Sequence, residues 1–210
     1  MPFQLHPSQK LVDQFREKPW QGTHPATARF LFIGLDANYG ADIERTLPEV
    51  FDYHSDGVVF WQRHGVHHPF LMPHYTGSGR KYHQKFAEIG FSPQHANQVS
   101  FIEALHLPTV GVNKLTAGDL DPGHLRRLAD FIDHGATEYV FMPSGVTNLL
   151  RQAPQFRWLP RQPNPSNGAL GILRGRRGQM VYQMYHLSCY GWQSGILDRQ
   201  IGEIRGMLKL

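Results

Sequence analysis

Apolar runs alternate with amphipathic segments along the chain, and this alternation predicts strands interleaved with helices. The clearest run, Arg29–Leu35, is apolar almost throughout, which indicates a strand with both faces covered. Further runs predict strands at Val99–Leu105, Thr137–Met142 and Gln179–Tyr185. Such alternation is typical of sheets covered by helices on both sides. The sequence therefore predicts an α/β fold, a three-layer α/β/α sandwich with a central, mostly parallel sheet.

Capping residues and apolar stripes locate the helices. Ser8 is a favourable N-cap, Pro122 suits a first helical position, and Gly135 suits a helix end. The predicted helices are Ser8–Glu17, Pro122–His134, the segment from Ser144-Gly145 through Arg151, and residues 195–209. Turn formers dominate Lys18–Thr27 and Pro108–Asp121, and Pro154–Gly178 is irregular and rich in Pro, Gly and Arg. The segment Asp42–Ser92 mixes helical stretches with Gly, Pro and His. We expect the long segment Asp42–Ser92 to be a loop-rich insertion over a functional site, without a second core.

Length and composition limit the class of protein. A chain of 210 residues with 40% hydrophobic content suits a single domain spanning residues 1–210. No run approaches the roughly 18 apolar residues that cross a bilayer, and Met1–His6 lacks the features of a secretory signal. We therefore expect a soluble, cytoplasmic monomer. Cys189 is the only cysteine, so an internal disulfide, an iron–sulfur cluster and a thiolate zinc site are excluded, and we expect no cofactor and no metal.

The charge balance is compatible with a polyanionic partner. The formal net charge is +4, and thirteen histidines add positive charge at mildly acidic pH. Arg174, Arg176 and Arg177 cluster between glycines in a polar stretch. Such a loop suits DNA phosphates, with a solvated basic turn as the alternative.

Two glycine-bearing turns follow apolar runs at opposite ends of the chain. The first, within Phe30–Gly40, contains Asp36, and the second, within Met180–Gly191, contains His186. Loops that leave the carboxyl ends of parallel strands meet at one crevice. We therefore expect this carboxylate and this imidazole to face one another across a catalytic cleft.

These two turns resemble the motifs of the uracil-DNA glycosylase superfamily. The first motif in its most familiar branch is G-Q-D-P-Y-H-G, which the chain matches at Gly34, Asp36 and Gly40. The second is H-P-S-P-L-S, which it matches at His186 and Ser188. The resemblance covers most of the chain in element order but only these turns in residue identity. It implies a uracil-DNA glycosylase-like fold and a monofunctional DNA glycosylase that flips a base out of DNA and leaves an abasic site.

The resemblance also implies roles for individual residues. Asp36 would stabilise the positive charge on the sugar and orient water, and His186 would donate to a carbonyl oxygen of the leaving base. The implied substrate contacts are Gly34, Leu35, Asn38, Tyr39, the stacking aromatic Phe60, and a base-recognising Glu103 or His106. The implied DNA contacts are the phosphate-binding Ser144 and Ser188 and the inserting Tyr190, beside the arginine cluster.

Two departures from the family pattern bear on the substrate. Glu103 or His106 stands where the family commonly has an asparagine, and a glutamate can accept from an exocyclic amine. Ala37-Asn38 replaces the proline and tyrosine that close the family's pocket against C5 groups. Both departures favour a modified or damaged base over plain uracil, and so DNA repair or defence against phage DNA with unusual bases. Neither active loop contains a lysine, so a Schiff-base step has no nucleophile there.

Several alternatives remain open from the sequence. Asp36 could be a turn former, and Phe60 and Tyr190 could be packing residues. The histidine run Arg63–His68 could bind a metal, although its spacing matches no strong signature, and a site-covering or DNA-facing loop is preferred. The alternative functions are an inactive nucleic-acid-binding module of the same fold and a glycosidase acting on free nucleosides or nucleotides.

Overall fold

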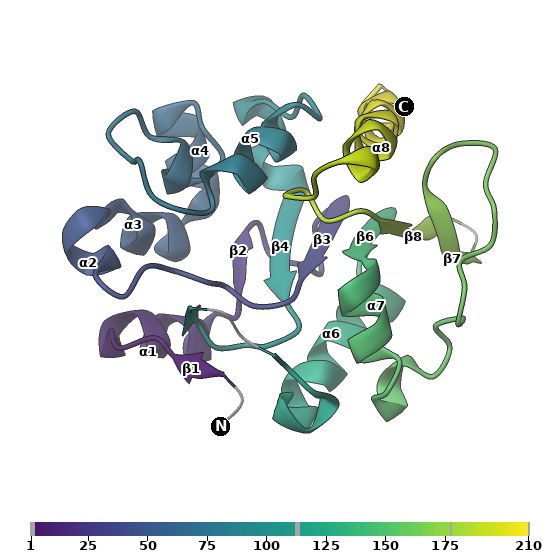
Figure 1. Ribbon diagram of the computed structural model, residues 1–210, viewed down its shortest axis with the longest axis horizontal. Coiled ribbons are helices and arrows are strands. Elements are labelled where there is room, and N and C mark those ends of the chain that lie inside the picture. Colours follow the sequence, from purple (N-terminus) through teal and green to yellow (C-terminus); the bar gives the residue numbers. More distant parts are fainter. Residues whose placement is uncertain (1–2, 112–113, 177, 210) are drawn as a thin grey trace.

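A mostly parallel sheet forms the centre of the computed structural model, which describes residues 3–111, 114–176 and 178–209 (Figure 1). The described residues form a six-stranded sheet with the order β2-β4-β3-β6-β8-β7. The strands are β2 Trp20–Gly22, β3 Phe30–Gly34, β4 Val99–Glu103, β6 Tyr139–Pro143, β7 Gly171–Arg176 and β8 Gln179–Met184. The four inner strands are parallel, and β2 and β7 pair antiparallel at the two edges. A separate ribbon pairs β1 (Gln4–Leu5) with β5 (Thr109–Val110).

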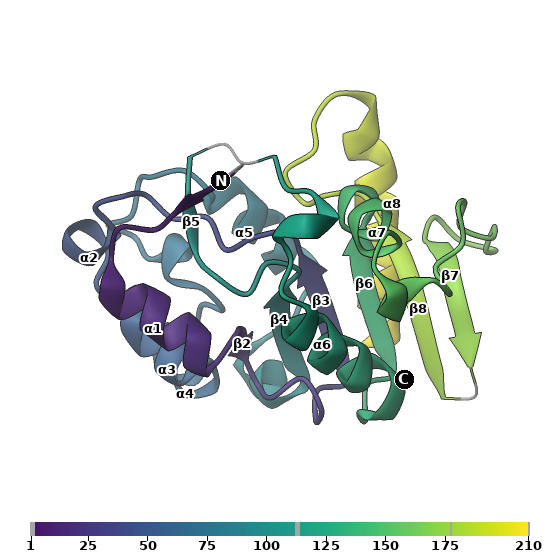
Figure 2. The ribbon, with the colours of Figure 1, turned by 90° about the horizontal axis from the view of Figure 1, so that it is seen from below.

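Helices cover both faces of the sheet (Figures 1 and 2). The α-helices are α1 Gln9–Glu17, α2 Ile43–Thr46, α3 Glu49–Ser55, α4 Gly57–His64, α5 Arg80–Ala87, α6 Pro122–His134, α7 Ser144–Leu150 and α8 Trp192–Met207. Short 3-10 turns lie at Pro69–Leu71, Pro93–Gln98, Ala117–Asp119 and Pro154–Phe156. The predicted α/β class and parallel sheet are confirmed at this level. Of the helices in the described ranges, none is long and apolar enough to span a bilayer.

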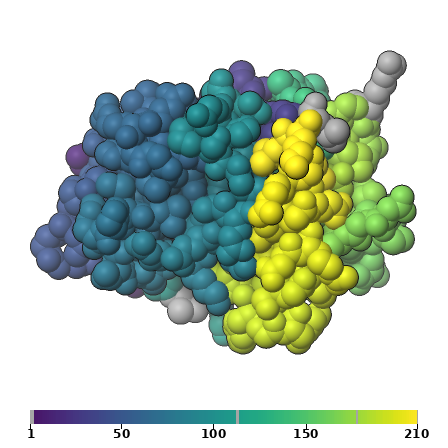
Figure 3. All heavy atoms as spheres, turned by 90° about the horizontal axis from the view of Figure 1, so that it is seen from above, coloured from purple at the N-terminus to yellow at the C-terminus, as the bar shows by residue number. Residues whose placement is uncertain are grey.

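The alternation of side chains along the strands separates two cores. Leu31 and Ile33 of β3 face α6 and α7, whereas Phe30 and Phe32 face α4, α5 and α8. Figure 3 shows the second of these faces, with α8 in yellow beside the blue and teal surface of the α3–α5 region. Because both faces of β3 are packed, its sequence is apolar at every position from Phe30 to Ile33.

The segment between β3 and β4 has a core of its own, which corrects the prediction of a loop-rich insertion. A third cluster of buried residues contains Phe15 of α1 together with residues of the α2–α3 segment, namely Ile43, Leu47, Val50 and Phe51. The helical stretches expected in this segment form helices of only 4 to 8 residues, and their apolar positions are too few to reveal a shared core in the sequence. This cluster supports one wall of the site described below.

Two predicted irregular segments contain strands. β2 lies within Lys18–Thr27, and β7 lies within Pro154–Gly178. Both are edge strands, with one neighbour each and a partly polar composition. Edge strands need no continuous apolar run, so the sequence pattern does not reveal them.

Candidate functional site

A cavity of about 1130 Å³ opens at the carboxyl ends of the parallel strands. β3 lies between β4 and β6, so the chain leaves β3 toward one side and later returns to its other side. Ligands of open α/β sheets bind at such a switch point. The ends of β3, β4, β6 and β8 each contribute to the cavity lining, with Asp36, Glu103, Ser144 and His186 respectively.

Asp36 is held in place by its loop. The Thr109 hydroxyl donates to Asp36 Oδ2 at 2.5 Å. Backbone hydrogen bonds join Thr109 N–H to the Ala37 carbonyl and Tyr39 N–H to the Thr109 carbonyl, and the Asn38 amide donates to the Gly111 carbonyl at 2.7 Å. The loop after β3 is therefore tied to β5, which fixes the direction of the half-buried Asp36 carboxylate.

His186 follows β8, and the turn after it selects a tautomer. Its Nδ1 accepts from the Ser188 backbone N–H at 3.3 Å and lies 2.6 Å from Ser188 Oγ. These contacts place the proton of the neutral ring on Nε2, where it can be donated to a ligand. His186 is exposed, yet the surrounding protein desolvates the ring enough to lower the pKa of His186, and the charge of Asp36 opposes that shift. A neutral ring with Nε2–H is the form that donates a hydrogen bond without carrying charge.

The structure thus brings Asp36 and His186 into one cavity, as the sequence predicts. A third titratable group lies with them at the end of β4, where Glu103 is paired in register with Gly34. Burial, and secondly the charge of Asp36, raises the pKa of Glu103 to about 8. The cavity therefore contains a second carboxyl group beside Asp36, and this group holds its proton near neutral pH.

The predicted contacts near Asp36 largely line this cavity. Gly34, Leu35, Asn38 and Tyr39 are lining residues, as are Ser144 and Ser188. Tyr190 is 81% exposed on the loop before α8, and Trp192 is 74% exposed at the start of that helix. Two large aromatic side chains therefore project from the loop that carries His186.

The position of Phe60 shows that the prediction of a stacking role for this residue is wrong. It is 2% exposed on α4, where its ring packs against Tyr53 at 5.5 Å and His64 at 4.5 Å between centroids. Its side chain turns into the helical layer because α4 packs there, so it does not reach the cavity wall. The aromatic lining residues are Tyr39, Phe70, Tyr82, Phe101 and Tyr185. The sequence did not identify Phe70 and Tyr82 as cavity residues, because their neighbours in the sequence do not distinguish them from aromatic residues of the core.

His106 is also displaced from the site. The backbone turns after β4, where Leu105 N–H bonds to the Leu35 carbonyl, and His106 lies beside His124 with ring centroids 5.4 Å apart. It is not one of the lining residues, which leaves Glu103 as the candidate on this strand.

Two members of the arginine cluster, Arg174 and Arg176, lie toward the opposite end of the sheet. Arg176 pairs in register with Gln179, the first residue of β8, whereas the cavity lies beyond Met184, about 16 Å further along that strand. Arg174 and Arg176 contact Asp133 at 2.8 and 3.3 Å, and Arg174 stacks over Trp158. These two arginines therefore belong to the structure of the sheet edge. Arg177 lies outside the described residues.

The basic side chains that line the cavity are lysines and not these arginines. Lys81 of α5 and Lys114 line it, and both are exposed. Among the described residues, no carboxylate forms an ion pair with either one. An isolated lysine in a polar segment carries no signal in the sequence, so neither was predicted.

The histidine run is interior at His67 and His68, whereas Arg63 and His64 are exposed. His67 and His68 are each 3% exposed, His67 Nε2 lies 3.1 Å from His83 Nδ1, and His68 stacks on His83 at 3.6 Å. Burial lowers the pKa of all three, so they are neutral aromatic packing groups. Within the described ranges, no three histidine, cysteine or carboxylate side chains are arranged to hold a metal ion.

Comparison with known proteins gives no assignment: no protein-family model matches this chain, and no curated protein matches its sequence significantly.

Proposed function

We propose that this protein is a monofunctional DNA glycosylase with a uracil-DNA glycosylase-like fold, acting on a modified or damaged base. The observation that carries the proposal is the convergence of Asp36 and His186 on one cavity from the exits of the first and last parallel strands. The two residues match the catalytic positions of both motifs, and the strand order gives them a shared crevice.

The two side chains suit opposite charges of one transition state. Breaking the bond between a base and its sugar leaves the sugar positive and the base negative. The Asp36 carboxylate, oriented by Thr109, stabilises the sugar cation and orients the attacking water. Nε2–H of neutral His186 donates to a carbonyl oxygen of the leaving base.

The surroundings suit a base that has been turned out of a DNA strand. Tyr39, Phe70 and Tyr82 provide aromatic surface inside the cavity, and Tyr190 projects from its rim region, where it can fill the gap left by the base. Asn38 is bonded to Thr109 and Gly111, and Ala37 is small. No bulky side chain at these two positions closes the cavity, which favours a base larger than uracil.

Lys81 and Lys114 are expected to contact DNA phosphates on either side of the extruded nucleotide. Lys81→Gln or Lys114→Gln should therefore weaken binding uniformly across sequences. Each should also reduce the slope of log K against log salt by about 0.7 to 0.9, the effect of one lost phosphate contact. The measurement is fluorescence anisotropy of a labelled oligonucleotide over a series of salt concentrations.

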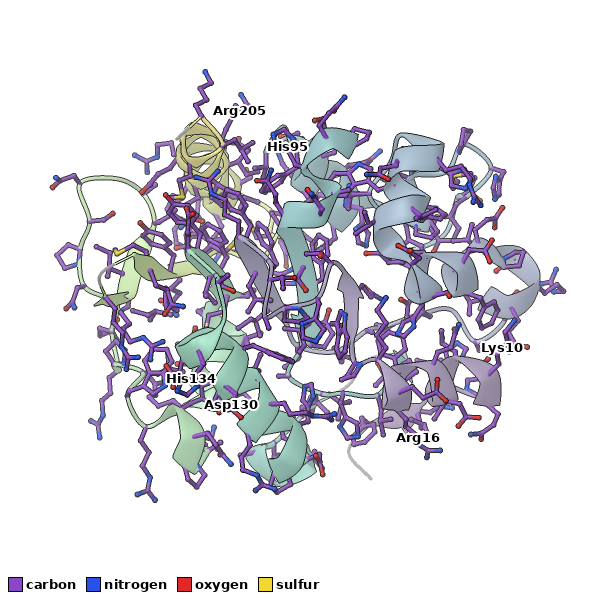
Figure 4. All side chains as sticks on the ribbon, turned by 180° about the vertical axis from the view of Figure 1, so that it is seen from behind. Lys10, Arg16, His95, Asp130, His134 and Arg205 are labelled. Carbon is purple, nitrogen blue, oxygen red and sulfur yellow. The ribbon has the colours of Figure 1, made fainter. Side chains whose placement is uncertain are left out.

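Arg176→Gln and Lys10→Gln are the matched controls for that experiment. Arg176 lies at the far end of the sheet, and Lys10 projects from α1 (Figure 4), so neither should change the slope. A slope that responds to Arg176 and not to the two cavity lysines would contradict this placement of the DNA.

The proposed activity is tested with oligonucleotides that each carry one modified base. Single- and double-stranded forms are incubated with the protein, released bases are identified by mass, and abasic sites are detected by alkaline cleavage. Release of a base from a strand that stays intact until alkali is added supports a monofunctional glycosylase. DNA binding without release of any base would favour the inactive binding module, and release from free nucleosides alone would favour the nucleoside glycosidase.

A further inference from the structure

Glu103 occupies an unusual position in the cavity. The Cβ of an alanine at Gly34 would lie 1.9 Å from Glu103 Oε2 and 2.6 Å from its Cδ. The carboxyl group therefore fills the space that a side chain on the neighbouring strand would take. A glycine at position 34 is required for this arrangement, and Gly34 leads directly into the Asp36 loop.

The Glu103 side chain is half-buried at the wall of the cavity. Among the residues that the structure describes, no hydrogen bond or ion pair reaches either oxygen, whereas the Glu103 backbone carbonyl contacts His124 Nε2 at 2.8 Å. A polar group that lines a cavity and is not paired with the surrounding side chains is available to a ligand.

The groups around Glu103 favour its neutral form. Asp36 contributes a negative charge, and the phenols of Tyr39, Tyr53 and Tyr82 also interact with Glu103. Burial raises the pKa of these three phenols, so they remain uncharged. Lowered pKa values keep the imidazoles of His124 and His186 neutral as well. No cation among these groups offsets the charge that Glu103 would gain on ionisation.

We propose that Glu103 is the general acid of this site, which donates its proton to a ring nitrogen of a cytosine-type base while the base is released. This inference rests on the proposed glycosylase function and specifies its substrate class. A neutral carboxylic acid donates through its O–H and accepts through its C=O. That pair matches a base edge on which a ring nitrogen acceptor adjoins an exocyclic amino group.

His186 narrows the class of base further. Its Nε2–H needs a carbonyl oxygen near the bond that breaks, which a cytosine ring has and an adenine ring lacks. The small Ala37 and the tethered Asn38 leave room at the cavity wall for a substituent on C5. Cytosine with or without a C5 group therefore satisfies both His186 and Glu103.

The two carboxyl groups of Glu103 and Asp36 supply and accept every proton that the reaction transfers. The bond between sugar and base breaks with its electron pair moving to the base, and the proton of Glu103 passes to the ring nitrogen, so the base leaves neutral. Water adds to the sugar carbon, and its proton passes to Asp36. Asp36 then returns a proton to Glu103, directly or through water in the cavity, and both groups regain their starting states. Paired carboxyl groups in different environments commonly divide acid and base roles in this way.

Glu103→Gln tests the inference, because an amide keeps the shape but supplies no acidic proton. We expect wild-type single-turnover release of a cytosine-type base to fall as pH rises above about 8, where Glu103 ionises. The variant should release this base about 10²–10⁴-fold more slowly at pH 7 and lose the alkaline fall, with oligonucleotide affinity little changed. Glu17→Gln, at the exposed end of α1, is the control and should match the wild type.

A second measurement does not depend on turnover. Difference infrared spectroscopy of the wild-type protein should show a protonated carboxyl band that disappears near pH 8 and is missing from Glu103→Gln. A variant with the wild-type rate and pH profile, or a wild-type protein without this band, would overturn the role of Glu103 while leaving the glycosylase intact. If the wild type released no base from any oligonucleotide, the proposed function would fall, and this inference with it.

Discussion

Asp36→Asn is expected to reduce base release by about 10²–10⁴-fold while DNA affinity stays near the wild-type value. The asparagine amide has almost the same shape and can still accept from the Thr109 hydroxyl. It lacks the negative charge that stabilises the sugar cation and the basic oxygen that takes the proton of water. The loss should therefore appear in the rate of the chemical step.

Single-turnover kinetics with saturating protein separates that step from binding, which anisotropy measures independently. Asp52→Asn removes one exposed carboxylate from α3 and should leave both quantities unchanged. An Asp36→Asn protein that releases base at the wild-type rate would identify Asp36 as a turn former. Loss of DNA binding together with release would indicate a structural role instead.

Phe32→Ala is expected to lower the free energy of unfolding by about 3–5 kcal/mol. Phe32 lies at the centre of an aromatic row across four parallel strands. Its ring stacks on Phe141 at 4.9 Å and on Phe101 at 5.7 Å, and Phe141 stacks on Tyr182 at 5.7 Å. The Phe32 side chain is 4% exposed, so its truncation leaves an internal cavity. The rings on either side of Phe32 also lose their contacts with it.

Urea unfolding followed by circular dichroism measures this change. Domains are stable by about 5–15 kcal/mol, so the variant should unfold at a much lower urea concentration with a similar slope. Phe32→Leu keeps most of the volume and should lose clearly less stability. A loss below about 1 kcal/mol for the alanine variant would show that the aromatic row contributes little.

Local features of the sequence predict the central elements well. The strands β3, β4, β6 and β8 coincide within about two residues with apolar runs, and Ser8 and Gly135 occupy the predicted ends of their helices. Each signal lies within a few residues of the element that it marks. Apolar runs and helix caps depend on burial and on backbone hydrogen bonds, both of which act locally.

Placement of side chains in the site depends on packing that the sequence pattern does not contain. Phe60 and Tyr82 are both aromatic residues of eight-residue helices, yet Phe60 is buried in α4 and Tyr82 of α5 lines the cavity. Only the direction in which each helix packs distinguishes them. The same holds for Lys81, which is one exposed lysine among several until α5 is placed beside the cavity.

Local residue patterns are sufficient to predict the α/β class, the positions of the buried parallel strands, and the polar residues Asp36 and His186 that follow two of these strands. The tertiary structure decided that these two groups share one cavity, that the Glu103 carboxyl group lies over Gly34, and that Arg174 and Arg176 stand at the far end of the sheet. Strand and helix signals are local because they arise from neighbouring residues. Strand order, register and strand direction set the distances between remote residues, and these follow from the packing of the whole chain.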